Sequence, residues 1–228
     1  MPNLLRLSAI VMITSLSLTA VSTAQNSETE LKTEQQRLFY FMGTTFGDNL
    51  LTLRLSDEEL ELVMRGVKDA ANGNPVKLDG PLYGPKLQQL ATERRSAWLE
   101  EERPKAEEYL KRMAAEEGAQ TMESGLIFLS LKAGSGTMPT PASIVKVNYH
   151  GTLRDGSVFD SSVERAQPVE VPLEMVMPCW KEGIVLMQSG GKAKITCPAG
   201  LAYQDRGLGN IPPGAAVTFE IEIIGITK

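Results

Sequence analysis

The sequence has few of the residues that bind metal ions. Its 228 residues include one histidine and two cysteines, so it gives no basis for a zinc site that needs several His and Cys ligands. It also has no excess of positive charge, since 28 acidic residues against 23 basic ones leave a formal net charge of -5. A mildly acidic chain gives no reason to expect nucleic acid or an anionic membrane surface as a partner. The composition, 42% hydrophobic and 22% charged, is that of an ordinary globular chain of one or two domains.

The first 24 residues differ from the rest. They contain a single charge, Arg6, followed by an apolar run over 7–21 and small residues at 22–24, a pattern that predicts a secretory signal peptide. The apolar run is too short for a stable membrane span, and no cysteine follows it that could carry a lipid anchor. We therefore expect an exported chain that begins near Gln25, although the thin positive region leaves an uncleaved anchor open.

Residues 25–118 have helical spacing and form the first predicted domain. The apolar face of the first helix is expected to include Leu31, Gln35, Leu38, Phe39 and Met42. A second helix should begin with a capping box, in which the Ser56 hydroxyl accepts the Glu59 N–H and the Glu59 carboxylate returns to Ser56. It should end near Asn72, where the following glycine tolerates a left-handed exit.

A third, long helix is predicted from about Pro85 to Gly118, after a Gly- and Pro-rich connection over 74–85. Pro104 removes one backbone donor, so we expect a kink or break there. The many charges of this helix are interpreted mostly as a solvated face. Two short helices and one long one do not obviously close a core, which favours a second copy across a two-fold axis. An intramolecular bundle is the alternative.

Residues 119–228 form the second predicted domain, in the α+β class. Short strands alternate with turns, and we expect a twisted antiparallel sheet wrapped on one short helix over 180–187. The first strand is expected over 125–131. Residues 145–162 form a hairpin, because apolar and polar residues alternate before the turn signal Asp155-Gly156.

Two aromatic residues, Tyr149 and Phe159, stand on opposite sides of this hairpin, and Asp160 follows the second. An alternating hairpin with two aromatics is more often core than site. Asp160 is harder to explain by packing, since an unpaired carboxylate beside a buried aromatic is costly. His150, the sole histidine, is interpreted as a surface residue beside the turn.

Five further motifs follow in order. They are VMPCWKEG at 176–183, GGKAKI at 190–195, Ala202-Tyr203, IPP at 211–213 and VTFEIE at 217–222. With the hairpin, they closely resemble FKBP-type peptidyl-prolyl cis/trans isomerases. By a looser pattern, the helical residues before them resemble the dimerisation segment of the macrophage-infectivity-potentiator and FkpA group.

The resemblance implies an exported homodimeric enzyme that accelerates Xaa-Pro isomerisation in unfolded or proline-containing protein substrates, without cofactor or metal. A Gram-negative source would make the destination the periplasm, with the outer-membrane surface or secretion also open. Two other classes of function stay open. One is a dimeric chaperone that holds unfolded chains, where two pockets on long arms gain avidity. The other, by family analogy alone, is a virulence or surface factor acting on host protein.

The resemblance also assigns roles to residues. Trp180 would form the floor of an apolar pocket under the proline ring. The walls would come from Tyr149, Phe159, Val176, Met177 and Phe219, although alternation in its strand makes Phe219 equally a core residue. The Tyr203 hydroxyl and the Met177 backbone N–H would bind substrate carbonyls. Asp160 would lie at the rim, in a positioning role rather than as a proton donor.

Three features depart from the family pattern. Val169 and Val171 stand where an aromatic-rich strand is common, so Val169 would line a shallower side of the pocket. Gln204 replaces a glycine, and residues 205–210 form an atypical flap next to Ile211, which would line the loop over the pocket. These departures leave substrate preference and the binding of macrolide inhibitors open.

The two cysteines, Cys179 and Cys197, have two interpretations. In a reducing compartment they would be small core residues, whereas in an exported protein a single pair suggests a disulfide. A bridge that closes a loop of about 17 intervening residues would raise the free energy of unfolding by about 3 kcal/mol. We hypothesise that it braces the pocket floor beside Trp180.

Overall fold

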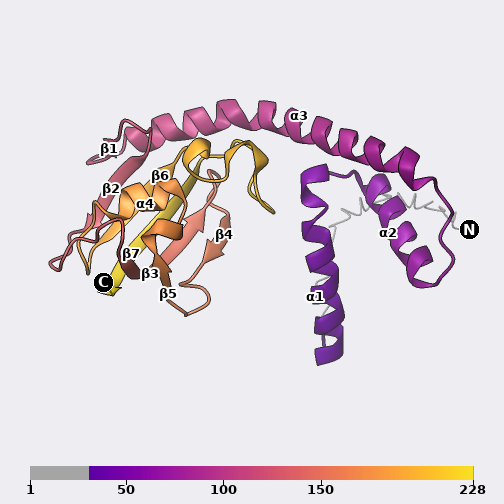
Figure 1. Ribbon diagram of the computed structural model, residues 1–228, viewed down its shortest axis with the longest axis horizontal. Helices are drawn as coiled ribbons and strands as arrows, with labels where there is room; N and C mark the ends of the chain where they lie inside the picture. The colour runs from indigo at the N-terminus through magenta and orange to yellow at the C-terminus, as the bar shows by residue number, and fades with distance from the viewer. Residues whose placement is uncertain (1–30, 228) are drawn as a thin grey trace, which may run out of the picture. The chain divides into compact units, whose positions relative to one another are not determined.

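Figure 1 shows the protein as a computed structural model, which describes residues 31–227. The predicted signal peptide and the start near Gln25 lie outside these residues. The chain divides into two compact units, Met1–Tyr40 and Phe41–Lys228. Within the part described, no helix is both long and apolar enough to cross a membrane.

The helical elements of the first half are α1 (Glu34–Asp48), a 3-10 turn (Leu51–Leu53), α2 (Asp57–Ala71) and α3 (Gly80–Ala114). The predicted capping box is confirmed, because Ser56 Oγ accepts from the Glu59 N–H at 3.3 Å and Glu59 Oε2 accepts from the Ser56 N–H at 3.0 Å. The predicted end of α2 is confirmed as well, with Gly73 at a φ of 76°. Neither α1 nor α2 has a buried residue.

Helix α3 begins five residues before the predicted start at Pro85, so the predicted connection over 74–85 is too long. Asp79 caps the helix by accepting the Leu82 N–H at 3.3 Å, and Pro81 stands in the first turn. Proline is well tolerated there, because the N–H that it lacks would have no partner within the helix. The prediction treated the prolines and glycines of this stretch as helix breakers, whereas the first turns of α3 contain them.

Of the kink or break predicted at Pro104, the break is wrong, because α3 continues through this residue to Ala114. Figure 1 shows this helix as one uninterrupted ribbon. A proline inside a helix costs about 3 kcal/mol. Here Glu102, Ala106 and Tyr109 are buried on both sides of the proline, and this packing offsets the lost hydrogen bond.

The second half forms a seven-stranded sheet whose pairings are all antiparallel. The strands are β1 (Gln120–Thr121), β2 (Ile127–Lys132), β3 (Ile144–Thr152), β4 (Val158–Ser161), β5 (Val169–Pro172), β6 (Lys192–Cys197) and β7 (Val217–Thr227). Their order is β1-β2-β6-β7-β3-β4, and β5 also pairs with β3. The predicted α+β class is confirmed.

One short helix, α4 (Pro178–Ile184), packs against this sheet. It begins two residues before the predicted start and ends three residues earlier. Short 3-10 turns occupy Leu173–Met175, Ala199–Leu201 and Gln204–Arg206. The core lies between α4 and the sheet. Alternate residues of a strand point to the same face, and the buried apolar ones of β3, β6 and β7 share this core with α4.

The two faces of the sheet have different neighbours. On β7, Phe219 belongs to the core beside α4, whereas the preceding Thr218 contacts Tyr109 of α3. The C-terminal part of α3 therefore covers the face opposite to the core (Figure 1).

Candidate functional site

An open hollow of about 210 Å³ lies at one end of the core. It is lined by Tyr149, Asp160, Val176, Met177, Trp180, Tyr203 and Phe219. These residues come from β3, β4, the segment before α4, α4 itself, the loop after β6, and β7. All seven were predicted from the sequence as site residues, and the fold brings them together from separate segments.

The floor and walls of the hollow are held by perpendicular aromatic contacts. The ring of Trp180 lies 5.0 Å from that of Tyr149 and 5.3 Å from that of Phe219, centroid to centroid. Phe159 packs in the same way on Phe219 and Tyr203, at 5.4 and 5.8 Å. Such edge-to-face pairs add about 0.5–1.5 kcal/mol each beyond area burial. The cluster therefore fixes the position of each ring before any substrate binds.

Glycine is required at position 151 by this cluster. A Cβ atom there would lie 2.7 Å from Phe159 Cζ and 3.1 Å from Phe219 Cε1.

Trp180 is 6% exposed, and its indole N–H has no hydrogen-bond partner among the residues described. Phe219, at 2% exposed, is both a core residue and part of the lining.

Asp160 is paired on both of its oxygens. It accepts a hydrogen bond from the Tyr149 hydroxyl and forms an ion pair with Arg165. Arg165 also donates to the Tyr149 hydroxyl oxygen at 2.8 Å, and its guanidinium lies 5.8 Å from the centre of that ring. The three side chains therefore hold one another in a closed arrangement at the rim of the hollow.

Arg165 is the site residue that the sequence analysis missed. It lies outside the motifs, in the loop after β4, and the neighbouring Ala166 has a left-handed φ of 51°. A search for a basic partner of the half-buried Asp160 could have found it, because Arg165 follows five residues later.

The electrostatics of the hollow keep each group in its ordinary charge state. Burial acts to raise the pKa of Asp160, but hydrogen bonds from Tyr149 and Arg165 and the Arg165 charge outweigh it and hold the pKa below its usual 3.8. Burial and then Asp160 raise the pKa of Tyr149. Burial, followed by the charge of Asp160, raises the pKa of Tyr203 to about 12. Both tyrosines are therefore neutral hydrogen-bond donors at ordinary pH.

The Tyr203 hydroxyl has no side-chain hydrogen bond within residues 31–227, which leaves it available to a ligand. Met177, whose backbone N–H was predicted to bind a carbonyl, stands directly before α4 as its N-cap residue.

Three predicted residues do not line the hollow. Phe159 is half-buried and packs edge-to-face against Tyr203 and Phe219, which do line it. Ile211 is 3% exposed and belongs to the core, where it forms two backbone hydrogen bonds with Leu208. Val169 lies on β5 opposite Val147 at the edge of the core. Direct contact of these three with a substrate stays a prediction.

A disulfide joins Cys179 and Cys197, with 5.8 Å between their Cα atoms. It connects the first turn of α4 to the end of β6, directly beside Trp180. Gly183 provides a second close approach, since a Cβ atom there would lie 2.5 Å from Ile195 Cδ1. The helix that carries the floor residue is thus held on the sheet at two points.

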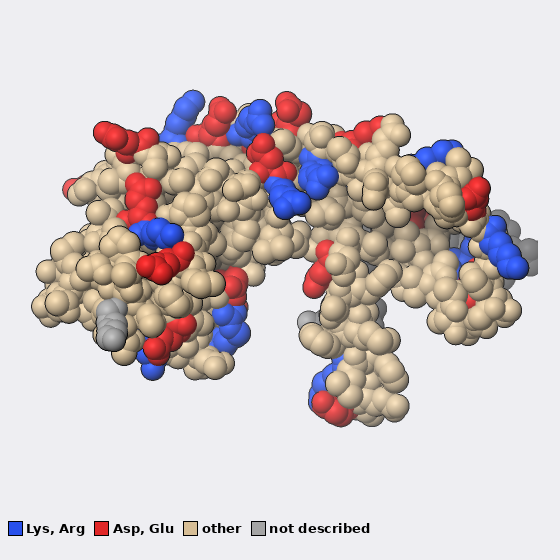
Figure 2. Space-filling model, viewed as in Figure 1, with Lys and Arg blue, Asp and Glu red and all other residues tan. Residues whose placement is uncertain are grey.

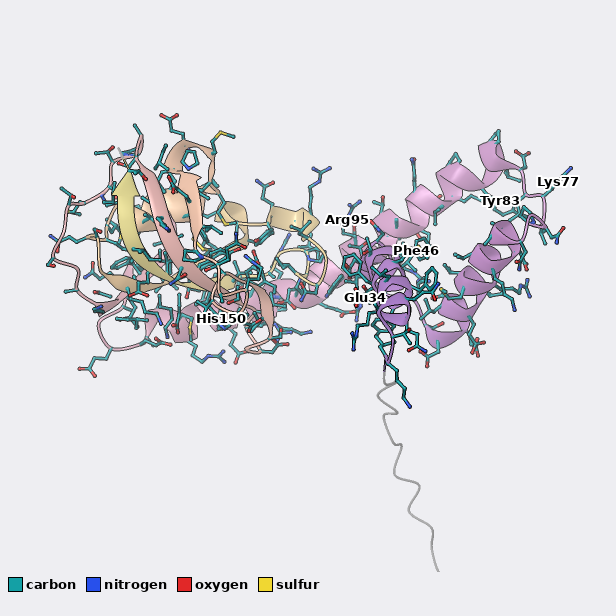
Figure 3. All side chains as sticks on the ribbon, turned by 90° about the horizontal axis from the view of Figure 1, so that it is seen from below. Glu34, Phe46, Lys77, Tyr83, Arg95 and His150 are labelled. Carbon is teal, nitrogen blue, oxygen red and sulfur yellow. A yellow bond between two sulfur atoms is a disulfide. The ribbon has the colours of Figure 1, made fainter. Side chains whose placement is uncertain are left out.

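The sole histidine takes no part in the lining of the hollow. His150, which is labelled in Figure 3, lies in β3 and is half-buried. Its Nδ1 lies 3.0 Å from Ser161 Oγ. No cluster of three or more His, Cys, Asp or Glu side chains that could hold a metal ion occurs between residues 31 and 227. The described groups instead offer apolar contact and hydrogen-bond donors.

Comparison with known families covers both halves of the chain. Residues 136–224 match the family described as FKBP-type peptidyl-prolyl cis-trans isomerase. Residues 35–129 match the family described as the domain amino terminal to FKBP-type peptidyl-prolyl isomerase.

Similar proteins span most of the chain. The FKBP-type peptidyl-prolyl cis-trans isomerase FkpA of Aeromonas hydrophila is 34% identical over 217 residues, which cover 90% of this chain and 81% of that protein. The FKBP-type 22 kDa peptidyl-prolyl cis-trans isomerase of Escherichia coli is 35% identical over 191 residues, which cover 82% of this chain and 93% of that protein. The crystal structure of FkpA from Escherichia coli matches with a TM-score of 0.63 at 28% identity, covering 86% of this chain and 98% of that one.

Proposed function

This chain belongs to the FKBP-type peptidyl-prolyl cis-trans isomerases, and from that premise we propose that the hollow above Trp180 is its active site. The predicted family and the predicted isomerase activity are confirmed by the relatives. The observation that supports the location is the convergence of seven lining residues, drawn from separate segments, on one largely apolar hollow with a paired carboxylate at its rim.

The reaction requires no covalent intermediate. Rotation about a peptide bond has a barrier of about 18–20 kcal/mol, because the resonance of the amide must be broken. The cis and trans forms of an Xaa-Pro bond differ by only about 0.5–1 kcal/mol, so the difficulty is kinetic. A catalyst needs only to bind the twisted amide more tightly than the planar one.

The lining residues suit that task. A twisted amide has lost resonance and carries a less polar carbonyl, so an apolar floor such as Trp180 favours it over the planar form. The walls formed by Val176, Met177 and Phe219 exclude water from the proline ring. The free hydroxyl of Tyr203 is positioned to donate to a substrate carbonyl, and its raised pKa keeps it protonated.

Asp160 acts in this scheme as a positioning residue. Its two partners, Tyr149 and Arg165, occupy both carboxylate oxygens and keep the group ionised. An ionised, doubly paired carboxylate has no proton to give, so its role is to orient the Tyr149 ring as a wall of the hollow.

The contribution of the Tyr203 hydroxyl is tested by Tyr203→Phe, which keeps the ring. One lost hydrogen bond of about 1 kcal/mol predicts a fall of about fivefold in kcat/KM for an Xaa-Pro peptide. Tyr83→Phe, on exposed α3, is the matched control and should leave the rate unchanged. Equal activities of parent and Tyr203→Phe would remove the hydroxyl from the mechanism.

We propose further that the protein is a homodimer joined through α1 and α2. Most of the large apolar side chains of these helices are exposed in the single chain, including Phe41 at 69% and Met42 at 64%. Figure 2 shows few charged side chains over α1 between its ends, and Figure 3 shows Phe46 projecting from it. A hollow of about 400 Å³ with a mostly apolar lining, from Thr44 to Leu60, lies within the same elements. A second copy would cover these surfaces.

Export to the periplasm is proposed from the signal-peptide pattern and from the FkpA relatives. The test is expression of the full chain in a Gram-negative host, followed by N-terminal sequencing of the protein from the periplasmic fraction. Cleavage near Gln25 is the expected result. An intact Met1 in the membrane fraction would support the uncleaved anchor instead.

The chaperone class is not better supported than the isomerase. Pocket substitutions that abolish isomerisation but spare the suppression of client aggregation would show that a separate holding activity coexists with the enzyme.

A further inference from the structure

Glu102 on α3 is a buried charge in a helix that the sequence predicted to be mostly solvated. Its side chain is 3% exposed, and its two carboxylate oxygens accept from Arg154 Nε at 2.8 Å and Arg154 Nη2 at 3.3 Å. Arg154 stands in the turn between β3 and β4. A buried carboxylate without a partner is strongly destabilising, so the helix and the turn are held together in this one geometry.

Other contacts connect the same stretch of α3 to the sheet. Arg112 Nη2 donates to the Arg154 carbonyl at 3.4 Å. The Tyr109 hydroxyl lies 2.6 Å from Thr218 Oγ1, in a buried hydrogen bond on β7. Ala106 packs against Ala216, which lies just before that strand.

The loop from Ile211 to β7 is also in contact with α3. A Cβ atom at Gly214 would lie 2.5 Å from Leu99 Cδ1, so helix and loop approach as closely as a glycine allows. The Gly214 N–H in turn donates to the Gln204 carbonyl at 2.9 Å, one residue from Tyr203.

Each of these contacts falls close to the proposed active site along the chain. The turn of Arg154 joins the strands that carry Tyr149 and Asp160, and Thr218 precedes Phe219. A displacement of α3 would therefore be transmitted to three of the lining side chains. None of these contacting residues lines the hollow, so any effect on it passes through the residues beside them.

We propose that Glu102 is a positioning residue of the isomerase, which sets the geometry of the hollow by holding Arg154 and the β3–β4 turn. This inference rests on the hollow being the active site. It makes the C-terminal part of α3 a component of the catalytic unit, and it couples the orientation of this helix to the rate of isomerisation.

The test compares Glu102→Gln, Arg154→Gln and the double variant in the full chain. Glu101→Gln is the matched control, because it removes the same charge from the same helix at an exposed ion pair with Arg54. The measurements are kcat and KM for an Xaa-Pro peptide, with the fluorescence of Trp180 recorded in a Trp98→Phe background, since the chain has two tryptophans.

Because small misplacements of binding groups have large kinetic effects, we expect each single variant to lower kcat about fivefold and to change the Trp180 emission. The double variant should be no slower than the worse single variant, since both remove one interaction. If Glu102→Gln fails to fold, Arg154→Gln provides the same comparison from the more exposed partner.

Variants that lose thermal stability but keep the kcat and Trp180 emission of Glu101→Gln would overturn the proposal, since α3 would then be a structural support alone. An inactive parent chain would overturn the proposed function and this inference together, so the two failures are distinguishable.

Discussion

The pairing of Asp160 determines how the proposed active site should respond to pH. Its pKa lies below 3.8 in the folded chain, because the hydrogen bonds of Tyr149 and Arg165 and the charge of Arg165 outweigh burial. A lowered pKa means that the carboxylate stabilises the fold at pH values above 3.8, and that this stabilisation is lost as pH falls through the folded pKa. Activity that depends on the ionised group should therefore not decline between neutral pH and 3.8.

Arg165→Gln should raise the pKa of Asp160 toward its ordinary value, since it removes a hydrogen bond and the adjacent positive charge. The measurement is an NMR titration of the Asp160 carboxyl carbon in the parent and in the variant. A parent pKa at or above 3.8, or an unchanged pKa in Arg165→Gln, would contradict the arrangement described here.

At the residue scale, the sequence was informative where motifs carry the site. Trp180, Tyr149 and Asp160 could be assigned by resemblance, and they lie together in the structure. Arg165 lies outside the motifs and was missed, although it follows its partner Asp160 by five residues. Glu102 could not be assigned, because it owes its role to a partner that only the fold brings close. For Glu102 that partner is 52 residues away in the sequence.

Among the elements, α4 is joined to the end of β6 by the disulfide between Cys179 and Cys197. Replacing both cysteines with alanine should lower the free energy of unfolding by about 3 kcal/mol, from the entropy of the loop that the bridge closes. Urea unfolding of the oxidised parent, the reduced parent and the variant checks this. Equal midpoints for the oxidised and reduced parent would contradict a bracing role.

The capping box of α2 predicts a smaller loss of stability than the disulfide does, confined to one helix. Ser56→Ala should lower the free energy of unfolding by about 1 kcal/mol, because one backbone N–H at the start of α2 loses its acceptor. Amide hydrogen exchange should show faster opening confined to the first turn of α2. Unchanged exchange there would mean that the cap contributes nothing in the assembled protein.

Element boundaries were predictable where local chemistry sets them. The capping box and the glycine after α2 fixed that helix correctly from the sequence. The predicted start of α3 was wrong, because Asp79 was not recognised from the sequence as its N-cap. The break predicted at Pro104 was wrong, because burial on both sides of the proline outweighs its local cost.

For the whole molecule, the exposed apolar helices predict a dimer that one charge should disrupt. Phe41→Glu places a carboxylate on the proposed interface and should convert the protein to a monomer in sedimentation equilibrium. Met175→Glu is the control, since Met175 is 83% exposed but lies in the turn before α4 rather than on α1 or α2. A monomeric parent, or a Phe41→Glu variant that remains dimeric, would contradict the proposed interface.

The order of the elements agrees with the sequence prediction, since helices come first and the strands of the sheet follow. The boundaries proposed at 25–118 and 119–228 divide the chain by secondary structure. The contacts of Glu102 and Tyr109 join the end of α3 to the sheet, and pairings of this kind cannot be read from a charge-rich helical pattern.

The most direct measurement is prolyl isomerisation of a short Xaa-Pro peptide by the full chain, beside Asp160→Leu and Tyr149→Ala variants whose fold is verified by circular dichroism. The account predicts an active parent and a loss of about tenfold or more in kcat/KM for each variant, which corresponds to about 1.4 kcal/mol of transition-state binding. A folded parent that does not accelerate the reaction, or variants as active as the parent, would contradict the assignment of this hollow as the isomerase site.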